Sequence, residues 1–202
     1  MVPMTPERER SPRRPPLVLR AHAADDLRYI RDTMARAAGS TAFPGVGAMV
    51  IGVTAIAAAA WAAGATSATA WLARWLVECV LSMAIGTAGM ALKSRTGGFA
   101  PGALRRFALV FAPPIVAGAL LTWRLRGDAP GILPGAWLLL YGVGIASAGA
   151  VSVPAVRTMG LAFMAVGAGA LFAPGHADAW LAAGFGGLHL GFGAWIARRH
   201  GG

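Results

Sequence analysis

The chain has 202 residues, of which 56% are apolar and only 13% are charged, and its mean hydropathy is +0.60. Soluble domains carry roughly 25% charged residues, so this composition excludes a water-soluble protein and predicts a membrane protein. The formal charge of +10 does not indicate nucleic-acid binding, because the arginines lie at the ends of apolar runs and in one N-terminal segment rather than along a folded face.

The N-terminal segment precedes the apolar part of the chain. Residues 1–20 hold five prolines and five arginines without apolar periodicity, which predicts a disordered basic tail. Within residues 21–39, Leu27, Ile30 and Met34 fall on one helical stripe. This stripe predicts an amphipathic helix along the inner leaflet or, alternatively, an ordinary cytosolic helix. We expect the first apolar run, which starts near residue 43, to act as its own insertion signal.

Six apolar runs follow, and each has about the length that crosses roughly 30 Å of hydrocarbon. They cover residues 43–63, 68–92, 107–123, 132–153, 155–173 and 179–197. The weakest boundary is the Val-Ser-Val-Pro turn between the fourth and fifth runs, where Pro154 favours a tight turn. The sequence therefore predicts an all-α bundle of six transmembrane helices over residues 40–202.

Basic residues beside the runs predict the orientation. With the N-terminus inside, the inner ends collect Arg28, Arg31, Arg36, Lys93, Arg95, Arg105, Arg106, Arg157, Arg198 and Arg199, and the outer ends collect only Arg124 and Arg126. Cytoplasmic loops are enriched in basic residues, so we expect both termini on the cytoplasmic side of a bacterial inner membrane. Near the ends of the runs lie residues of the type that anchors spans at the membrane surface: Trp61, Trp71, Trp123, Trp137, Trp180 and Trp195.

Two segments of the chain resemble each other weakly. FPGVGAMVIGV at residues 43–53 aligns with LPGAWLLLYGV at residues 133–143, which pairs two glycines, Gly45 and Gly52, with Gly135 and Gly142. Each segment opens a group of three runs, and three is odd, so this pattern indicates a 3+3 inverted repeat of the kind found in many transporters. The alternative is coincidence, since Pro and Gly are common at the start of membrane helices.

Arg74 and Glu78 are two charged residues inside the second predicted span, and their spacing of four places them on one helical face. Glu78 lies ten residues after the start of its run, or roughly 15 Å deep, whereas Arg74 can extend toward the outer surface. One interpretation is a carboxylate that binds a proton, a cation or a basic substrate. The alternatives are a buried ion pair with Arg74 or a protonated Glu78 hydrogen-bonded to a neighbouring helix.

His189 is the third candidate site residue, at similar depth in the last run. It lies between Gly187 and Gly191, a GxxxG spacing that allows another helix to approach closely. A neutral imidazole bonded across that contact is the simpler interpretation, and a titrating proton relay is the other. If Glu78 and His189 met, they would form an acid-base pair near the midplane.

Pro113 and Pro114 predict a helix break in the third span, because each removes a backbone donor. Such a break lines a binding site in some transporters and is a structural kink elsewhere. Cys79, the single cysteine, excludes an intramolecular disulfide and is interpreted as a small packing residue. We find no metal cluster, phosphate loop or dinucleotide motif in the sequence, and we expect no metal and no cofactor.

Several segments carry a family resemblance: DDLRYIRDTMARAAGSTAFPGVGAMVIGVTA, FAPPIVAGALLT, LPGAWLLLYGVG and AAGFGGLHLGFGAWIARRHGG. Together they resemble an uncharacterised family of small bacterial six-helix integral membrane proteins. The resemblance covers nearly everything after residue 20. It implies the fold and the membrane location, and it implies no activity.

Three classes of function fit these features. The first is a small transporter or channel subunit, indicated by Glu78, His189, the two prolines and the inverted repeat. The second is a membrane partner or anchor in a regulatory or signalling complex, indicated by the basic tail and the amphipathic helix. An intramembrane enzyme is the third, and it lacks clustered histidines and acids. The expected partners are the lipid bilayer and, through small-residue faces, a second copy or another membrane protein.

Overall fold

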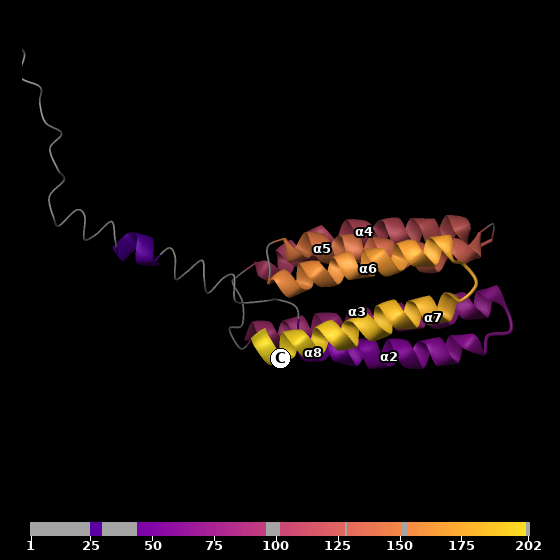
Figure 1. Cartoon of the computed structure of the whole chain (residues 1–202), viewed down its shortest axis with the longest axis horizontal. Coiled ribbons are helices and arrows are strands. Elements are labelled where there is room, and N and C mark those ends of the chain that lie inside the picture. Colours follow the sequence, from indigo (N-terminus) through magenta and orange to yellow (C-terminus); the bar gives the residue numbers. More distant parts are fainter. Residues whose placement is uncertain (1–24, 30–43, 96–101, 128, 151–152, 201–202) are drawn as a thin grey trace, which may run out of the picture. The chain divides into compact units, whose positions relative to one another are not determined.

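The computed structural model describes residues 25–29, 44–95, 102–127, 129–150 and 153–200 (Figure 1). The chain divides into two units, residues 1–36 and residues 37–202. In the first unit residues 25–29 are helical, and Arg28 lies 3.5 Å from the carboxylate of Asp25. The remaining parts of the predicted tail and amphipathic helix lie outside the described residues.

The described part of the second unit is helical. Its α-helices are α2 (Gly45–Ala63), α3 (Ala68–Arg95), α4 (Ala103–Leu125), α5 (Leu133–Gly149), α6 (Pro154–Phe172), α7 (Ala177–Leu181) and α8 (His189–His200). A 3-10 turn, η1 (Pro130–Ile132), precedes α5, and a π-helical segment, η2 (Ala182–Leu188), joins α7 to α8. Six stretches are long and apolar enough to cross a membrane, the last of them formed by α7, η2 and α8 together. The prediction of an all-α bundle with six spans is therefore confirmed.

Proline marks the start of three of these helices. Pro44 caps α2, and Pro134 and Pro154 lie in the first turns of α5 and α6. Proline suits these positions because its missing N–H would have no partner in the first turn. The turn that the sequence marks least clearly is also placed as expected, since α5 ends at Gly149 and α6 begins at Pro154.

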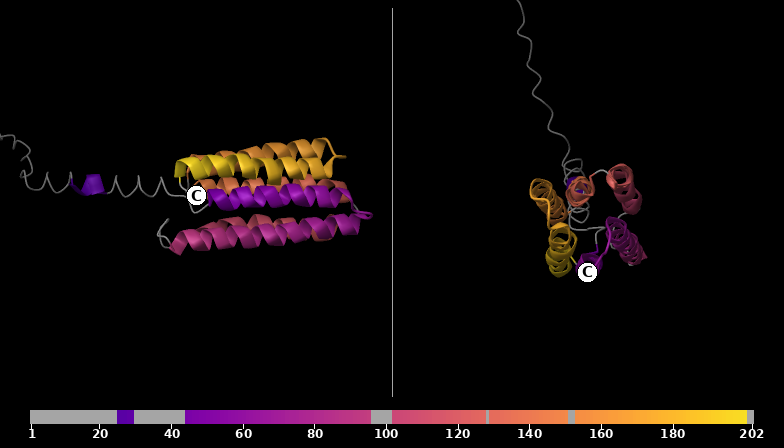
Figure 2. Two further views of the ribbon diagram at one scale, coloured as in Figure 1. Left: turned by 90° about the horizontal axis from the view of Figure 1, so that it is seen from below. Right: turned by 90° about the vertical axis from the view of Figure 1, so that its right-hand side faces the viewer.

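The six spans form two rows of three. In one row α5 packs between α4 and α6, and in the other α2 packs between α3 and α8 (Figure 2). Contacts between α6 and α8 connect the rows. The most deeply buried side chains come from α5, α6 and the last span, among them Leu138, Ile145, Met159, Phe163 and Ile196.

Glycines bring two antiparallel helix pairs into backbone contact. A Cβ on Gly52 would lie 2.8 Å from the carbonyl oxygen of Gly186, so the backbones of α2 and η2 approach closely at this point. A Cβ on Gly142 would likewise lie 2.7 Å from the carbonyl oxygen of Gly160, which brings α5 onto α6. Such contact replaces the hydrophobic effect that lipid cannot supply.

The close approach of the last span does not use the predicted GxxxG pair. A Cβ on Gly191 would have no neighbour within 4 Å, and one on Gly187 would meet only a carbonyl at 3.9 Å. Gly186 and Gly193 make the contact with α2 instead. Their spacing of seven corresponds to two helical turns, which keeps both on the seam between long antiparallel helices.

The expected helix break is not an interruption of α4, which continues from Ala103 to Leu125 through Pro113 and Pro114. Proline keeps φ near the helical value, so two adjacent prolines cost backbone hydrogen bonds without ending the helix when the turns on both sides are intact. Pro114 faces α5, and its Cγ would lie 3.5 Å from a Cβ on Gly144. Pro114 thus packs against α5, whereas Pro113 is exposed.

Helices α3 and α4 are the least buried of the six spans. Only 11% and 6% of the residues in their most apolar 18-residue stretches are buried, compared with 33 to 44% in the other four spans. Their exposed side chains are large and apolar, such as Val77, Val80, Leu109 and Leu120. These faces are suited to contact with lipid.

Candidate functional site

One face of α3 carries the polar groups that the sequence analysis singled out. Trp71, Trp75, Glu78 and Ser82 are spaced by four, three and four residues, which places them on one stripe of the helix. Trp75 and Glu78 are the two buried residues of α3, with exposed fractions of 3% and 6%. The stripe therefore faces the bundle, while the rest of α3 is largely exposed.

The Glu78 carboxyl group is held by two hydroxyl groups. Its Oε1 atom lies 2.8 Å from Oγ1 of Thr54 on α2 and 2.6 Å from Oγ of Ser82 one turn along α3. The Thr54 oxygen also lies 3.0 Å from the carbonyl oxygen of Ile51. A threonine has a single hydroxyl proton, so Thr54 can donate either to Glu78 or to Ile51.

This arrangement satisfies both protonation states of Glu78. When Glu78 is ionised, Thr54 and Ser82 both donate to its oxygen. When Glu78 is protonated, it can donate to Thr54 Oγ1 while the Thr54 hydroxyl turns to the Ile51 carbonyl. Uptake of a proton then needs only a hydroxyl rotation, with no buried group left unpaired.

Arg74 does not pair with Glu78. Its guanidinium donates a hydrogen bond to the carbonyl oxygen of Trp61 and lies 5.3 Å from the centre of the Trp61 ring. Within the described residues the one ion pair is that of Arg28 with Asp25. Glu78 is therefore buried without a cationic partner in the part of the chain that the structure describes.

His189 lies at a second polar position, separate from Glu78. Its Nδ1 atom is 2.8 Å from the carbonyl oxygen of Phe185, and its Nε2 atom is 2.7 Å from the Tyr141 hydroxyl oxygen. The carbonyl can only accept, so Nδ1 carries a proton, and in the neutral ring Tyr141 donates to Nε2. His189 is 1% exposed and is surrounded by the rings of Tyr141, Phe163 and Phe185.

Glu78 and His189 do not form the acid-base pair that the sequence left open, because the described residues include no hydrogen bond or ion pair between them. Each has its own partners on different helices. The aromatic surroundings and two hydrogen bonds of His189 fit a structural role, whereas the hydroxyl partners of Glu78 fit exchange of a proton.

The structure adds a cluster that the sequence analysis missed. Asp178 on α7 accepts hydrogen bonds at its Oδ1 atom from the indole nitrogens of Trp71, at 2.7 Å, and Trp75, at 2.9 Å. The Trp71 ring stacks on Trp137 of α5, with ring centres 5.8 Å apart and planes inclined by 4°. Trp137 in turn donates to Thr122 of α4 at 2.8 Å.

Most tryptophans lie at the end of the bundle where α3 begins, which we call the tryptophan end: Trp61, Trp71, Trp75, Trp123, Trp137 and Trp180. Trp71 and Trp137 are half-buried and stacked, so they are not the lipid-facing anchors that their place near span ends suggested. Asp178 lies one residue before the last apolar run of residues 179–197, and the one sequence signal for the cluster is the spacing of four between Trp71 and Trp75.

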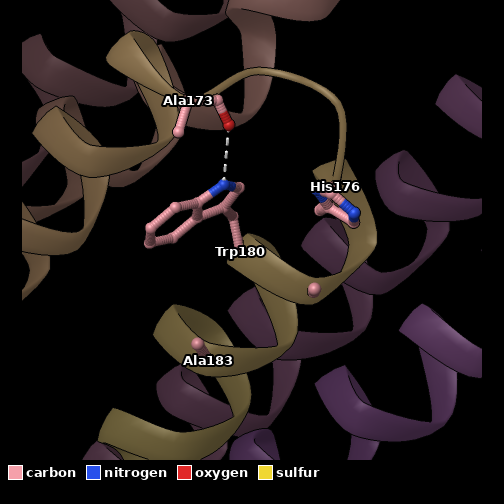
Figure 3. A pocket seen from close by; sticks show the side chains of 5 residues that line it. Ala173, His176, Trp180 and Ala183 are labelled. Carbon is pink, nitrogen blue, oxygen red and sulfur yellow. Dashed lines mark hydrogen bonds between the residues drawn. The ribbon is translucent and has the colours of Figure 1, made fainter.

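A shallow pocket of about 330 Å³ also lies at the tryptophan end, beside the α6–α7 turn (Figure 3). It is lined by Ala173, His176, Ala179, Trp180 and Ala183. Trp180 reaches across it to donate a hydrogen bond of 3.0 Å to the Ala173 carbonyl (Figure 3). Neither Glu78 nor His189 lines this pocket, so it is separate from both buried polar positions.

Among the described residues, no group of three or more His, Cys, Asp or Glu side chains is placed to hold a metal ion. Pro113 and Pro114 lie on α4, away from the hydroxyl partners of Glu78 on α2 and α3.

Comparison of the chain with protein-family models, with curated proteins and with solved structures finds no match.

Proposed function

We propose that this protein is a small transporter or channel subunit of a bacterial inner membrane in which Glu78 takes up and releases a proton. The observation that carries the proposal is the position of Glu78: it is buried in a spanning helix, has no cationic partner among the described residues, and is held by hydroxyl groups that suit both of its protonation states. We also propose that the chain belongs to the uncharacterised family of small bacterial six-helix membrane proteins that its sequence resembles.

The energetics support a functional carboxyl group. An acidic residue at the centre of a spanning helix costs about 2.5 to 3.5 kcal/mol on insertion scales. Glu78 lies ten residues into α3, which corresponds to about 15 Å along the helix and about half of the hydrocarbon thickness. A neutral residue would fill the same place at lower cost, so the carboxyl group needs a reason beyond packing.

The distribution of basic residues supports the proposed orientation. Seven lie at the end of the bundle where α3 ends, namely Lys93, Arg95, Arg105, Arg106, Arg157, Arg198 and Arg199, and Arg74, Arg124 and Arg126 lie toward the tryptophan end. By the positive-inside rule, the tryptophan end faces the outside and the C-terminus of α8 faces the cytoplasm. A proton from either surface would then cross about half of the membrane thickness to reach Glu78.

The proposal is tested with purified protein in liposomes. A potassium gradient with valinomycin sets the membrane potential, and an internal pH dye records proton entry. We expect proton flux with the parent protein, its loss with Glu78→Gln, and its retention with Cys79→Ala, the adjacent and exposed control position. Flux that is equal in the parent and in Glu78→Gln would refute the role of Glu78.

A hydrophobic carbodiimide provides a second test, because it modifies protonated carboxyl groups inside membranes. We expect mass spectrometry to find the adduct on Glu78 and to show less of it as the pH of the medium rises. No adduct at any pH, in protein that remains folded, would mean that Glu78 does not take up a proton.

The low burial of α3 and α4 favours a second candidate function, a membrane partner in a complex, with a second copy or another protein covering these faces. A nitroxide on Cys79, the exposed native cysteine of α3, distinguishes the two. Lipid contact gives strong relaxation by oxygen and weak relaxation by a water-soluble nickel complex. Weak relaxation by both would instead indicate a protein partner over α3.

A further inference from the structure

Hydrogen bonds between side chains connect the last span to α3 at the tryptophan end. The backbone of α3 packs mainly on α2, yet Trp71 and Trp75 of α3 both donate to one oxygen of Asp178 on α7, at 2.7 and 2.9 Å. Two donors on one carboxylate oxygen fix its position more firmly than one would, and hydrogen bonds to a charged acceptor are among the stronger ones. Asp178 thus joins α7 to a helix that lies more than 100 residues away in the chain.

The cluster lies directly on one side of Glu78. Trp75 precedes Glu78 by one helical turn on the same stripe and is 3% exposed, and Trp71 lies one turn further toward the tryptophan end. On the other side of Glu78 the stripe continues with Ser82, Ile85 and Gly89. The two indole side chains therefore lie between Glu78 and the tryptophan end.

The same layer extends across the bundle. Trp71 stacks on Trp137 of α5, and Trp137 donates to Thr122 of α4. Together with Asp178, these residues connect α3, α4, α5 and α7 at one level. Trp75 is buried in this layer and Trp71 and Trp137 are half-buried, so the three rings stand between Glu78 and the medium at this end.

The segment that carries Asp178 is suited to movement. Helix α7 is only five residues long and is followed directly by the π-helical segment η2. The turn before it contains Gly175 with a φ of +129°, which a residue with a side chain rarely adopts. Irregular backbone on both sides of α7 places the Asp178 carboxylate between two points where the chain can bend.

We propose that Asp178, Trp71 and Trp75 form a latch that closes the tryptophan end of the bundle over Glu78, and that Glu78 exchanges protons with that side only when the latch opens. The proposal rests on the proposed proton exchange at Glu78. Asp178 and the π-helical segment η2 then have a gating role. Proton binding at Glu78 alone would not require such a role.

The latch is tested by thiol accessibility. In a Cys79→Ala background, Ser82→Cys places a reporter thiol one turn beyond Glu78, and a membrane-impermeant cationic methanethiosulfonate is added at the tryptophan end of oriented proteoliposomes. Labelling should be slow with the latch intact. With Asp178→Ala, or with Trp71→Phe and Trp75→Phe together, we expect labelling at least tenfold faster, equivalent to about 1.4 kcal/mol.

Trp180→Phe is the matched control, because Trp180 lies at the same end but donates to the Ala173 carbonyl rather than to Asp178. It should leave the labelling rate unchanged. If Asp178→Ala does not fold, the double phenylalanine variant decides, since it keeps an aromatic ring at both positions while it removes the indole donors. An unchanged labelling rate in the folded latch variants, or fast labelling before any latch change, would overturn the latch.

Proton flux is measured separately, in proteoliposomes of variants that retain Ser82, because Ser82 donates to Glu78. Loss of flux in Glu78→Gln with no effect of the latch variants on labelling would refute the latch and leave the proposed function standing. Faster labelling in the latch variants together with equal flux in the parent and Glu78→Gln would refute the proposed function, and with it the gating of proton exchange.

Discussion

Tyr141 on α5 and His189 on α8 are joined by a hydrogen bond of 2.7 Å between the phenol oxygen and Nε2 of the imidazole. The other ring nitrogen bonds to the Phe185 carbonyl at 2.8 Å, so the buried imidazole has a partner on each side. The pair links the two rows of helices. Its surroundings are aromatic, and a partner lost here cannot be replaced by water without opening the core.

We therefore expect Tyr141→Phe to lower the free energy of unfolding by about 1 to 3 kcal/mol, because it keeps the ring and removes the hydroxyl group that bonds to Nε2. Equilibrium unfolding in mixed detergent micelles measures the change. Tyr29→Phe is the matched control, since the chain has two tyrosines and Tyr29 is 70% exposed. Equal stability of the two variants would show that the Tyr141–His189 bond contributes nothing to the fold.

The glycine contacts lead to a second prediction. A Cβ on Gly142 would lie 2.7 Å from the Gly160 carbonyl oxygen and 2.8 Å from the Met164 nitrogen, and neither backbone atom can move without shifting α6. Gly142→Ala should therefore destabilise the bundle by about 1 to 3 kcal/mol. Gly191→Ala, which meets nothing within 4 Å, should be neutral or stabilising by up to about 1 kcal/mol. The same unfolding measurement compares them, and a larger loss from Gly191→Ala would contradict the observed packing.

Hydropathy and span length were enough to predict the six helices, because each run must satisfy its backbone within the hydrocarbon. They were not enough to predict which faces meet. The last span contains Gly184, Gly186, Gly187, Gly191 and Gly193. Several pairs of these glycines have a spacing suited to close approach, so the sequence alone does not identify Gly186 and Gly193 as the contact.

The partners of Glu78 could not be predicted for a similar reason. Ser82 lies on the same helix at a readable spacing, but Thr54 comes from α2, and only the packing of α2 on α3 brings it to Glu78. The Asp178 cluster joins residues more than 100 positions apart, which no local pattern can encode.

The weak resemblance between residues 43–53 and 133–143 finds a parallel in the packing. Gly52 and Gly142, which the alignment pairs, both lie at backbone contacts with an antiparallel helix, although Gly52 contacts the last span and Gly142 contacts α6, which are not equivalent in the repeat. In addition, α2 packs on α3 and α8, while α5 packs on α6 and α4, so each first helix meets the third helix of the other group. An inverted repeat with exchanged third helices requires this pattern, and the repeat itself stays a prediction.

The basic asymmetry predicts the topology in the membrane. In a Cys79→Ala background, Ser67→Cys in the α2–α3 turn should react with a membrane-impermeant maleimide from the periplasmic side of intact cells. Ser94→Cys at the other end of α3 should react only after the cells are permeabilised. Reporter fusions should likewise place residues 126–131 outside and both termini inside. Periplasmic labelling of Ser94→Cys would reverse the orientation, and the latch would then face the cytoplasm.

The last prediction tests which residue interacts with Glu78. The sequence spacing suggested Arg74 as its partner, whereas the structure shows a hydrogen bond with Thr54. Two double-mutant cycles measure the interaction energies, one with Glu78→Gln and Arg74→Gln and the other with Glu78→Gln and Thr54→Val. Arg74 donates to the Trp61 carbonyl rather than to Glu78, so its cycle should be additive within about 0.5 kcal/mol. Thr54 lies 2.8 Å from Glu78, and its cycle should show a coupling of about 0.5 to 3 kcal/mol.

The cycles also bear on function, because a buried ion pair and a proton site respond differently to neutralisation. An ion pair with Arg74 would make Glu78→Gln strongly destabilising and the double variant partly rescued, since the first change leaves an unpaired guanidinium. A carboxyl group held by hydroxyls tolerates the amide, which keeps its shape and can still bond to Thr54 and Ser82 while it cannot exchange a proton. We therefore expect Glu78→Gln to fold with a modest loss of stability and to lose proton flux. A rescue of stability by Arg74→Gln would instead identify Glu78 as half of a structural ion pair.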